Sequence, residues 1–331
     1  ACWLNRPIAP VKPHSHAMKI KANGIDIEVE DTAEINPQDL DAYTRPAVLL
    51  IMGLGMQLVA WPPQLIEALV DAGFRVIRMD NRDIGLSQHF DHLGKPNILW
   101  AGLKYKLGLK VRAPYTLEDM AQDALGVLDV LGVERAHVVG VSMGGMVAQR
   151  VAIAAPQRVL SLTSIMSSSG AKGLPQAKPE ITRVLLKRPE SDAPEAVADH
   201  YVRLFKAIGS PAYPVPEDDM RERVLLGVER SFHPEGTLRQ MMAIVADTKR
   251  ASQLARVTSP TLVLHGRADP LVPFAHGEDT AARISGARLV GFDGMGHDLP
   301  PEPVAQMLDA LIPHLQAAAP PAPYLVSKAV A

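Results

Sequence analysis

A five-residue turn constrains this chain more than any other feature, because it joins an expected strand directly to an expected helix. The turn reads Gly140-Val141-Ser142-Met143-Gly144 and lies between the strand-like run 136–139 and the helix-forming run 146–155. So sharp a turn forces Ser142 into strained backbone geometry, and glycine at both ends avoids clashes with the neighbouring backbone. The serine hydroxyl is then exposed at the amino end of a helix, where free N–H groups stabilise negative charge. This arrangement is typical of a nucleophile elbow.

Two polar, glycine-rich loops later in the chain carry the partners that such a serine needs. The expected strand 261–265 leads into a loop with Asp269, and the expected strand 288–292 leads into a loop with His297. Serine, acid and histidine in this chain order, each after a strand, predict a catalytic triad at one edge of a sheet. Asp293 and Asp298 lie in the same loop as His297 and stay open as alternative acids.

These motifs, taken in order, resemble those of the α/β-hydrolase superfamily, and in particular its capped esterase and lipase-like branch. The resemblance covers residues 18–315 and extends to four further motifs: the acid loop Gly266-Arg267-Ala268-Asp269, the histidine loop Gly294-Met295-Gly296-His297, the turn 80–87 (Asp-x-Arg-x-x-Gly-x-Ser), and Met52-Gly53-Leu54-Gly55. The last motif stands where the family usually has a His-Gly oxyanion loop. Met52 replaces that histidine, which removes a side-chain brace of the loop but leaves the backbone donors in place.

The resemblance implies the α/β-hydrolase fold: a mostly parallel eight-stranded sheet flanked by helices, with a helical cap inserted after strand six. The alternation of strand-like and helix-like segments favours the same class. We expect a core of residues 17–170 and 250–316, a cap of residues 171–249 that is richer in charge and proline, and weakly ordered ends at 1–16 and 317–331.

Local signals predict most of the elements. Asn23-Gly24 suits the tight turn of an opening hairpin, and Thr116 with Asp119 suits a helix amino terminus. Continuous apolar runs predict buried strands, and 3.6-residue periodicity predicts helices; the strands are expected at 18–22, 25–30, 46–52 and 74–80, and the helices at 62–72, 116–131, 195–208, 237–247, 274–283 and 303–314.

The segment 98–112 has two interpretations. It mixes apolar residues with three lysines and one arginine. An amphipathic element that faces a membrane is one interpretation, and a loop that packs beneath the cap is the other. We favour the loop, because the glycines of the segment weaken a helix.

The resemblance also implies the chemistry. Ser142 would be the nucleophile, His297 the general base, and Asp269 the acid that orients the imidazole. The backbone N–H groups of Leu54 and Met143 would form the oxyanion hole, and no metal or organic cofactor is needed. Further residues are expected around the site: Met52, Gly53 and Trp61 as substrate-binding residues, and Asp80 and Asp83 as turn-stabilising residues with Arg82 as an internal partner.

Composition bounds the partners. The net charge is only −2 and the charges are dispersed, so no basic face for nucleic acid is expected. No run reaches the roughly 18 apolar residues of a membrane span. Cys2 is the only cysteine, which excludes an intramolecular disulfide. We expect a cytoplasmic monomer or homodimer; a tether through an upstream segment or a lipid on Cys2, with a periplasmic lipoprotein origin, is the alternative.

The sequence predicts a carboxylic ester hydrolase that acts on short to medium acyl esters. An aminopeptidase, a lactonase or a carbon-carbon bond hydrolase would use the same triad. An aminopeptidase would need acidic cap residues to hold a substrate ammonium group, and the candidates are Glu195, Glu217, Asp218 and Asp219. A catalytically silent binding protein with this fold is a third interpretation.

Overall fold

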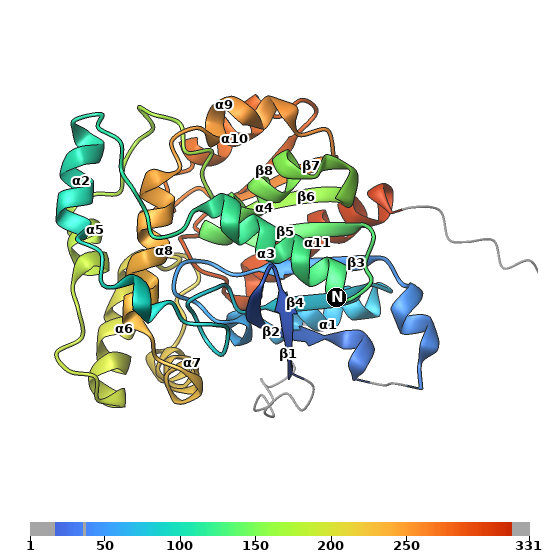
Figure 1. The fold of residues 1–331 in the computed structure, drawn as a ribbon, viewed down its shortest axis with the longest axis horizontal. Coiled ribbons are helices and arrows are strands. Elements are labelled where there is room, and N and C mark those ends of the chain that lie inside the picture. The colour runs from blue at the N-terminus through green and yellow to red at the C-terminus, as the bar shows by residue number, and fades with distance from the viewer. Residues whose placement is uncertain (1–16, 36–37, 320–331) are drawn as a thin grey trace, which may run out of the picture.

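An eight-stranded sheet runs through the computed structural model, which describes residues 17–35 and 38–319 (Figure 1). The strand order is β1-β2-β4-β3-β5-β6-β7-β8; β1 and β2 pair antiparallel, and all pairs from β4 to β8 are parallel. The predicted fold class is therefore confirmed. The strands are β1 (Ala17–Ala22), β2 (Ile25–Asp31), β3 (Ala47–Ile51), β4 (Arg75–Met79), β5 (Ala136–Val141), β6 (Val159–Ile165), β7 (Thr261–Gly266) and β8 (Arg288–Phe292).

The opening hairpin has the turn that its sequence predicts. Asn23 and Gly24 connect β1 to β2 with φ of 48° and 78°, the left-handed values that a two-residue hairpin turn requires. The central strands are equally consistent with their sequences, since every residue of β3, β5, β6 and β7 is buried. Continuous apolar sequence corresponds here to strands covered on both faces.

Helices cover both faces of the sheet. In Figure 1, α3 and α4 lie in front of the strands, and α1 and α11 lie behind them. Each pair closes one of the two large hydrophobic clusters of the core. The α-helices of the described residues are α1 (Pro63–Asp71), α2 (Ile98–Lys106), α3 (Leu117–Val130), α4 (Met143–Ala154), α5 (Pro179–Leu186), α6 (Pro194–Ile208), α7 (Glu217–Arg230), α8 (Pro234–Ala246), α9 (Arg250–Gln253), α10 (Ala275–Arg283) and α11 (Pro301–Ala318).

The insertion between β6 and β7 is helical. It contains α5, α6, α7 and α8, which lie together to one side of the strands in Figure 1. This arrangement agrees with the helices predicted at 195–208 and 237–247. The division into a core and a cap at residues 171–249 stays a prediction.

The prediction of a loop at 98–112 is wrong, because residues 98–106 form α2. Its amino end is capped by Asn97, whose Oδ1 accepts from the N–H of Trp100 at 2.9 Å. Its carboxyl end is followed by Gly108, whose φ is 69°, and the N–H of Leu109 bonds back to the carbonyl of Lys104 at 2.9 Å. These two caps, with packing against α8, outweigh the cost of one internal glycine.

Helix α11 ends later than predicted. It continues through Ala318 and includes Pro313, and the run 316–319 consists of good helix formers. The expected weakly ordered segment therefore does not begin at 317. Within the described residues, no helix combines the length and the apolar character that a bilayer crossing requires. Cys2 and the remaining residues of the predicted ends lie outside the described part of the chain.

Candidate active site

Ser142 lies at the apex of the turn between β5 and α4, and its backbone is strained as the sequence predicts. Its φ of 54° and ψ of −119° are values that residues with a side chain rarely adopt. The packing explains the flanking glycines. A Cβ at Gly140 would lie 2.1 Å from the carbonyl oxygen of Gly144, and one at Gly144 would lie 2.0 Å from the carbonyl oxygen of Ile51. No side chain fits at either position, so the turn holds the serine hydroxyl in one place.

The three residues predicted as a triad meet at the carboxyl edge of the sheet. His297 Nε2 lies 3.0 Å from Ser142 Oγ, and His297 Nδ1 lies 2.7 Å from Asp269 Oδ2. Because the carboxylate only accepts, Nδ1 is the donor nitrogen, and Nε2 is left to accept the serine proton. The three side chains are thus aligned for proton transfer from the hydroxyl to the imidazole.

Asp269 is held rigidly below the histidine. Its side chain is fully buried, and its Oδ1 accepts from the N–H groups of Leu271 and Val272 at 2.9 and 2.8 Å. His265 packs beside it, with Nε2 donating to the carbonyl of Val272 at 2.7 Å. Burial lowers the pKa of His265, so this second imidazole stays neutral and leaves the carboxylate to His297.

The two alternative acids are directed elsewhere. Asp298 Oδ1 accepts from the hydroxyl of Ser210, which also accepts from the N–H of Gly296 at 2.9 Å. Asp293 is solvent-exposed and pairs with Arg267 at 3.2 Å. Neither carboxylate has a hydrogen bond to the imidazole of His297, whereas Asp269 does.

The loop after β3 lies against the nucleophile. A Cβ built on Gly53 would be 3.3 Å from Ser142 Cβ and 3.9 Å from Ser142 Oγ, so a side chain at this position would fit only tightly against the serine. Leu54 follows it directly, and Met143 begins α4, where the first N–H groups have no partner within the helix. Both predicted oxyanion donors therefore lie in segments adjacent to the hydroxyl; their role stays a prediction.

Two buried amides brace this loop in the absence of the family histidine. The Oε1 of Gln240, on α8, accepts from the N–H of Gly55 at 3.0 Å, and its Nε2 donates to the carbonyl of Arg82 at 2.9 Å. Asn81 Nδ2 donates to the carbonyl of Met52 at 2.9 Å. The loop after β3 is thus held by Asn81, in the turn after β4, and by Gln240, in the helical insertion.

The side chains of Met52 and Trp61, predicted to bind substrate, are buried in the hydrophobic cluster behind the sheet. Of the three predicted substrate-binding residues, Gly53 is the one whose position beside Ser142 is shown. The roles of Met52 and Trp61 stay predictions.

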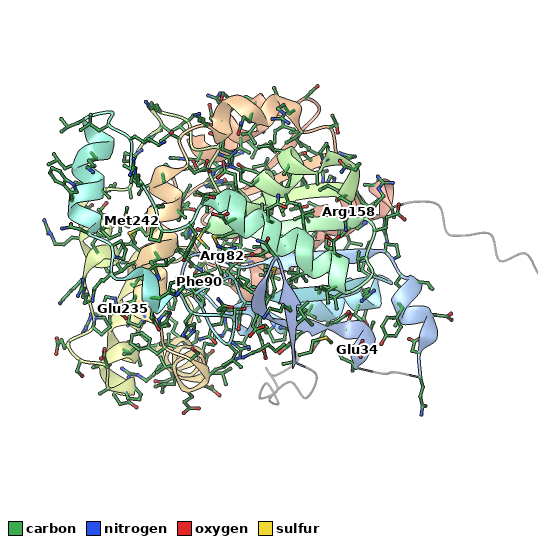
Figure 2. The ribbon with its side chains drawn as sticks, viewed as in Figure 1. Glu34, Arg82, Phe90, Arg158, Glu235 and Met242 are labelled. Atoms are coloured by element: carbon green, nitrogen blue, oxygen red, sulfur yellow. The ribbon has the colours of Figure 1, made fainter. Side chains whose placement is uncertain are left out.

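The acidic turn after β4 pairs with arginines of the helical insertion. Asp80 Oδ2 accepts from Arg230 at 2.6 Å, and both oxygens of Asp83 accept from Arg239 at 2.7 and 2.8 Å. The predicted internal partner, Arg82, is not involved: its guanidinium pairs with Asp123 on α3 at 2.5 Å. The Asp123 side chain is fully buried, and a buried carboxylate requires a cationic partner, which Arg82 supplies. Figure 2 shows Arg82 beside Phe90, whose ring centroid is 5.3 Å from the guanidinium.

Burial and charge act in opposite directions on these carboxyl groups. Burial raises the pKa of the Asp80 carboxyl, and the guanidinium of Arg230 offsets only part of that effect. At Asp83, burial also raises the pKa, but the hydrogen bonds from Arg239 and from the N–H of Phe90 outweigh it and leave the pKa below its ordinary value. The hydrogen bonds from Arg239 of α8 thus favour the charged form of Asp83.

One group of described side chains has the spacing of metal ligands. The ligand atoms of His89, Asp91 and His233 lie within 4.8 Å of one another. However, the two imidazoles stack with centroids 3.8 Å apart and an interplanar angle of 2°. An ion bound to an imidazole nitrogen lies close to the ring plane, and two stacked parallel planes share no such point. Arg239 also places its guanidinium 3.1 Å from Asp91 Oδ1, so we assign no metal to this group.

Sequence reasoning missed the residues that the insertion contributes around the site. Arg230, Arg239 and Gln240 are polar residues on surface-like helices, about 90 to 100 positions after the serine. Nothing in their local pattern separates them from solvated side chains. The one available signal was the pair of acids at 80 and 83 in the turn. Carboxylates that become buried require cationic partners, and these could have been sought in the insertion.

Comparisons with known proteins place this chain among the hydrolases. A family model described as alpha/beta hydrolase fold matches residues 46–303. Rhodomycin D methylesterase of Streptomyces peucetius is 30% identical over 291 residues, which cover 82% of this chain and 91% of that protein. The 2-hydroxy-6-oxononadienedioate/2-hydroxy-6-oxononatrienedioate hydrolase of Cupriavidus pinatubonensis is 28% identical over 257 residues, which cover 76% and 80%.

The fold is also similar to solved structures. The meta-cleavage product hydrolase from Pseudomonas fluorescens IP01 superimposes with a TM-score of 0.68 at 20% identity, over 91% of this chain and 98% of that one. At this identity the likeness concerns the fold alone.

Proposed function

Because this chain belongs to the α/β-hydrolase family and its named relatives are hydrolases, we propose that it is a serine hydrolase that cleaves carboxylic esters. The observation that carries the proposal is the pair of hydrogen bonds at His297, 3.0 Å to Ser142 Oγ and 2.7 Å to Asp269 Oδ2. We propose short to medium acyl esters as substrates, and we include methyl esters because two relatives are named methylesterases.

The geometry supports a two-step mechanism. Ser142 Oγ attacks the ester carbonyl while its proton passes to His297 Nε2. The resulting oxyanion accepts hydrogen bonds from the N–H groups of Leu54 and Met143. His297 then protonates the departing alcohol, which leaves an acyl group on the serine. A water molecule, deprotonated by the same imidazole, attacks this acyl-enzyme, and the acid is released with the serine restored.

Cleavage of a carbon-carbon bond is the second candidate, because a relative that is 28% identical is named a 2-hydroxy-6-oxononadienedioate/2-hydroxy-6-oxononatrienedioate hydrolase. The same triad and oxyanion donors would serve that reaction. An ester series and a vinylogous 1,5-diketone distinguish the two candidates directly.

The aminopeptidase alternative has little support in the insertion. Glu195 pairs with Arg221 at 2.9 Å on the surface, and Glu217 pairs with Lys206. Asp218 is exposed and Asp219 is half-buried on the first turn of α7. Two of the four candidate acids are thus already paired with basic side chains.

The test is hydrolysis of a p-nitrophenyl ester series and of an aryl methyl ester by the parent and two variants. We expect Ser142→Ala and Asp269→Asn each to lower kcat by about 10⁴-fold or more, with unchanged thermal unfolding. A rapid burst of p-nitrophenol, equal to the enzyme concentration, should precede steady turnover.

Asp298→Asn is the matched control, since its carboxylate bonds to Ser210 and not to His297. If Ser142→Ala retained the parent rate, or if Asp298→Asn lost more activity than Asp269→Asn, the assigned triad would be wrong. Turnover of the diketone with no turnover of any ester would replace the proposed reaction with the second candidate.

A further inference from the structure

The segment around α2 concentrates basic residues. Between Asp91 and Glu118 the chain carries five basic residues and no acidic one, although the whole chain has 34 basic and 36 acidic residues. The basic residues are Lys95, Lys104, Lys106, Lys110 and Arg112. A chain of nearly balanced charge therefore has one strongly positive segment.

The same segment exposes large apolar side chains. Trp100, Leu103, Leu107 and Leu109 have exposed fractions of 55%, 46%, 64% and 55%. Spacing of three residues places Trp100 and Leu103 on one face of α2. Leu107 and Leu109 follow just after its last residue, Lys106. We call these four residues, with Lys104 and Lys110, the α2 patch.

The opposite side of α2 is fixed to the rest of the protein. Ala101 is buried against Val111 and against Met242 of α8, and Figure 2 shows Met242 between α8 and α2. In Figure 1, α2 lies at the outer margin of the fold, away from the sheet. The apolar face is thus presented outward by a helix that is anchored on its inner side.

The composition of the patch suits a lipid surface. Tryptophan and leucine on one face with lysines beside them are typical of helices that lie in the plane of a membrane interface. Lys104 Nζ lies 5.4 Å from the centroid of the Trp100 ring, so the charge stays at the edge of the apolar face, where lipid headgroups begin. Lys104 and Arg112 also line an open depression of about 350 Å³ together with Trp100, and they give it two cationic groups for a headgroup phosphate.

We propose that the α2 patch docks this protein on anionic phospholipid membranes, with Trp100, Leu103, Leu107 and Leu109 entering the interface and with Lys104, Lys110 and Arg112 contacting the headgroups. Each basic residue near an anionic surface adds about fivefold to the affinity, and the exposed leucines add the apolar contribution. A second copy of this chain would bury the same leucines but would bring the positive segments together, which disfavours that occupant.

Flotation with vesicles tests the proposal. The parent should bind vesicles in which about a third of the phosphatidylcholine is replaced by phosphatidylglycerol, and should bind at least about tenfold less to phosphatidylcholine alone. Binding should weaken when salt is raised from about 0.05 M to about 0.5 M. Leu107→Glu with Leu109→Glu should abolish binding, and Lys104→Gln with Lys110→Gln should weaken it by about tenfold or more.

Val130→Glu is the matched control, because Val130 is 51% exposed at the carboxyl end of α3 and lies outside the patch; it should bind as the parent does. Hydrolysis of a soluble ester should be unchanged in all these variants, which separates this proposal from the proposed function. No binding of the parent to anionic vesicles, binding that survives both patch variants, or a dimer that the leucine variant dissociates would each overturn the proposal.

Discussion

Replacing Gln240 with leucine tests whether α8 positions the loop that carries the expected oxyanion donor. The Gln240 side chain is completely buried. Its amide joins two segments, since it accepts from the N–H of Gly55 at 3.0 Å and donates to the carbonyl of Arg82 at 2.9 Å. Leucine has a similar volume but pairs with neither group, so the variant leaves one donor and one acceptor buried without partners.

The expected magnitude follows from these two groups. A buried polar group without a partner costs about 1–3 kcal/mol, so the free energy of unfolding should fall by about 2–6 kcal/mol. The cost of leaving the N–H of Gly55 buried without a partner acts on the loop itself, because the loop can regain a hydrogen bond by moving toward water. A cost of about 1–3 kcal/mol favours the displaced position by about 5- to 150-fold. Complete loss of an oxyanion donor costs about 10²- to 10³-fold, so we expect kcat to fall about tenfold to hundredfold.

The assay separates positioning from folding. The proposed role concerns the transition state, so KM for a p-nitrophenyl ester should change by less than about threefold while kcat falls. A trifluoromethyl ketone, whose serine adduct places an oxyanion in the same site, should bind more weakly by the factor lost in kcat/KM. Gln149→Leu is the control, because Gln149 on α4 is equally buried and bonds to Ser164 and Arg250 at 3.2 and 2.8 Å, without contact to the loop.

Two results would refute this reasoning. One is a folded Gln240→Leu protein whose kcat lies within about twofold of the parent. The other is a Gln149→Leu protein that loses as much kcat as Gln240→Leu, because general softening of the core would then explain both.

Two further predictions concern stability. Burial lowers the pKa of His137 to about 4, so this imidazole takes up a proton near pH 6.5 in the unfolded protein but not in the folded one. The free energy of unfolding should therefore fall by about 3 kcal/mol as pH drops from 7 to 4. Urea unfolding at both pH values should show a smaller fall for His137→Leu, and an equal fall would contradict the assignment. Gly144→Ala places a Cβ 2.0 Å from the carbonyl oxygen of Ile51 and should lower the free energy of unfolding by more than about 2 kcal/mol. Gly102→Ala, whose Cβ would have no atom within 4 Å, should stabilise α2 by up to about 1 kcal/mol. Denaturant titration compares the two variants, and equal effects would exclude the steric explanation.

Much of the fold was predictable because its signals are local. Asn23-Gly24 encodes a left-handed hairpin turn, Thr116 and Asp119 form the capping box that their spacing suggests, and the apolar runs of the central strands correspond to complete burial. Helix α2 was missed for a related reason. The glycines of the segment weaken a helix, but Asn97 at its amino end and Gly108 after its carboxyl end are local signals that favour one, and these two prevail.

The sequence by itself determined the order of serine, acid and histidine, the strained turn that holds Ser142, and the loops that bring the three to one sheet edge. These features depend on backbone geometry within a few residues, which sequence encodes directly. Only the tertiary structure decided that Asp269 and not Asp293 or Asp298 faces the imidazole. It also decided that Gln240 joins the loop at Gly55 to the turn at Arg82. Such pairings join residues far apart in the chain, and a buried donor or carboxylate selects its partner by proximity in space, which no local pattern records.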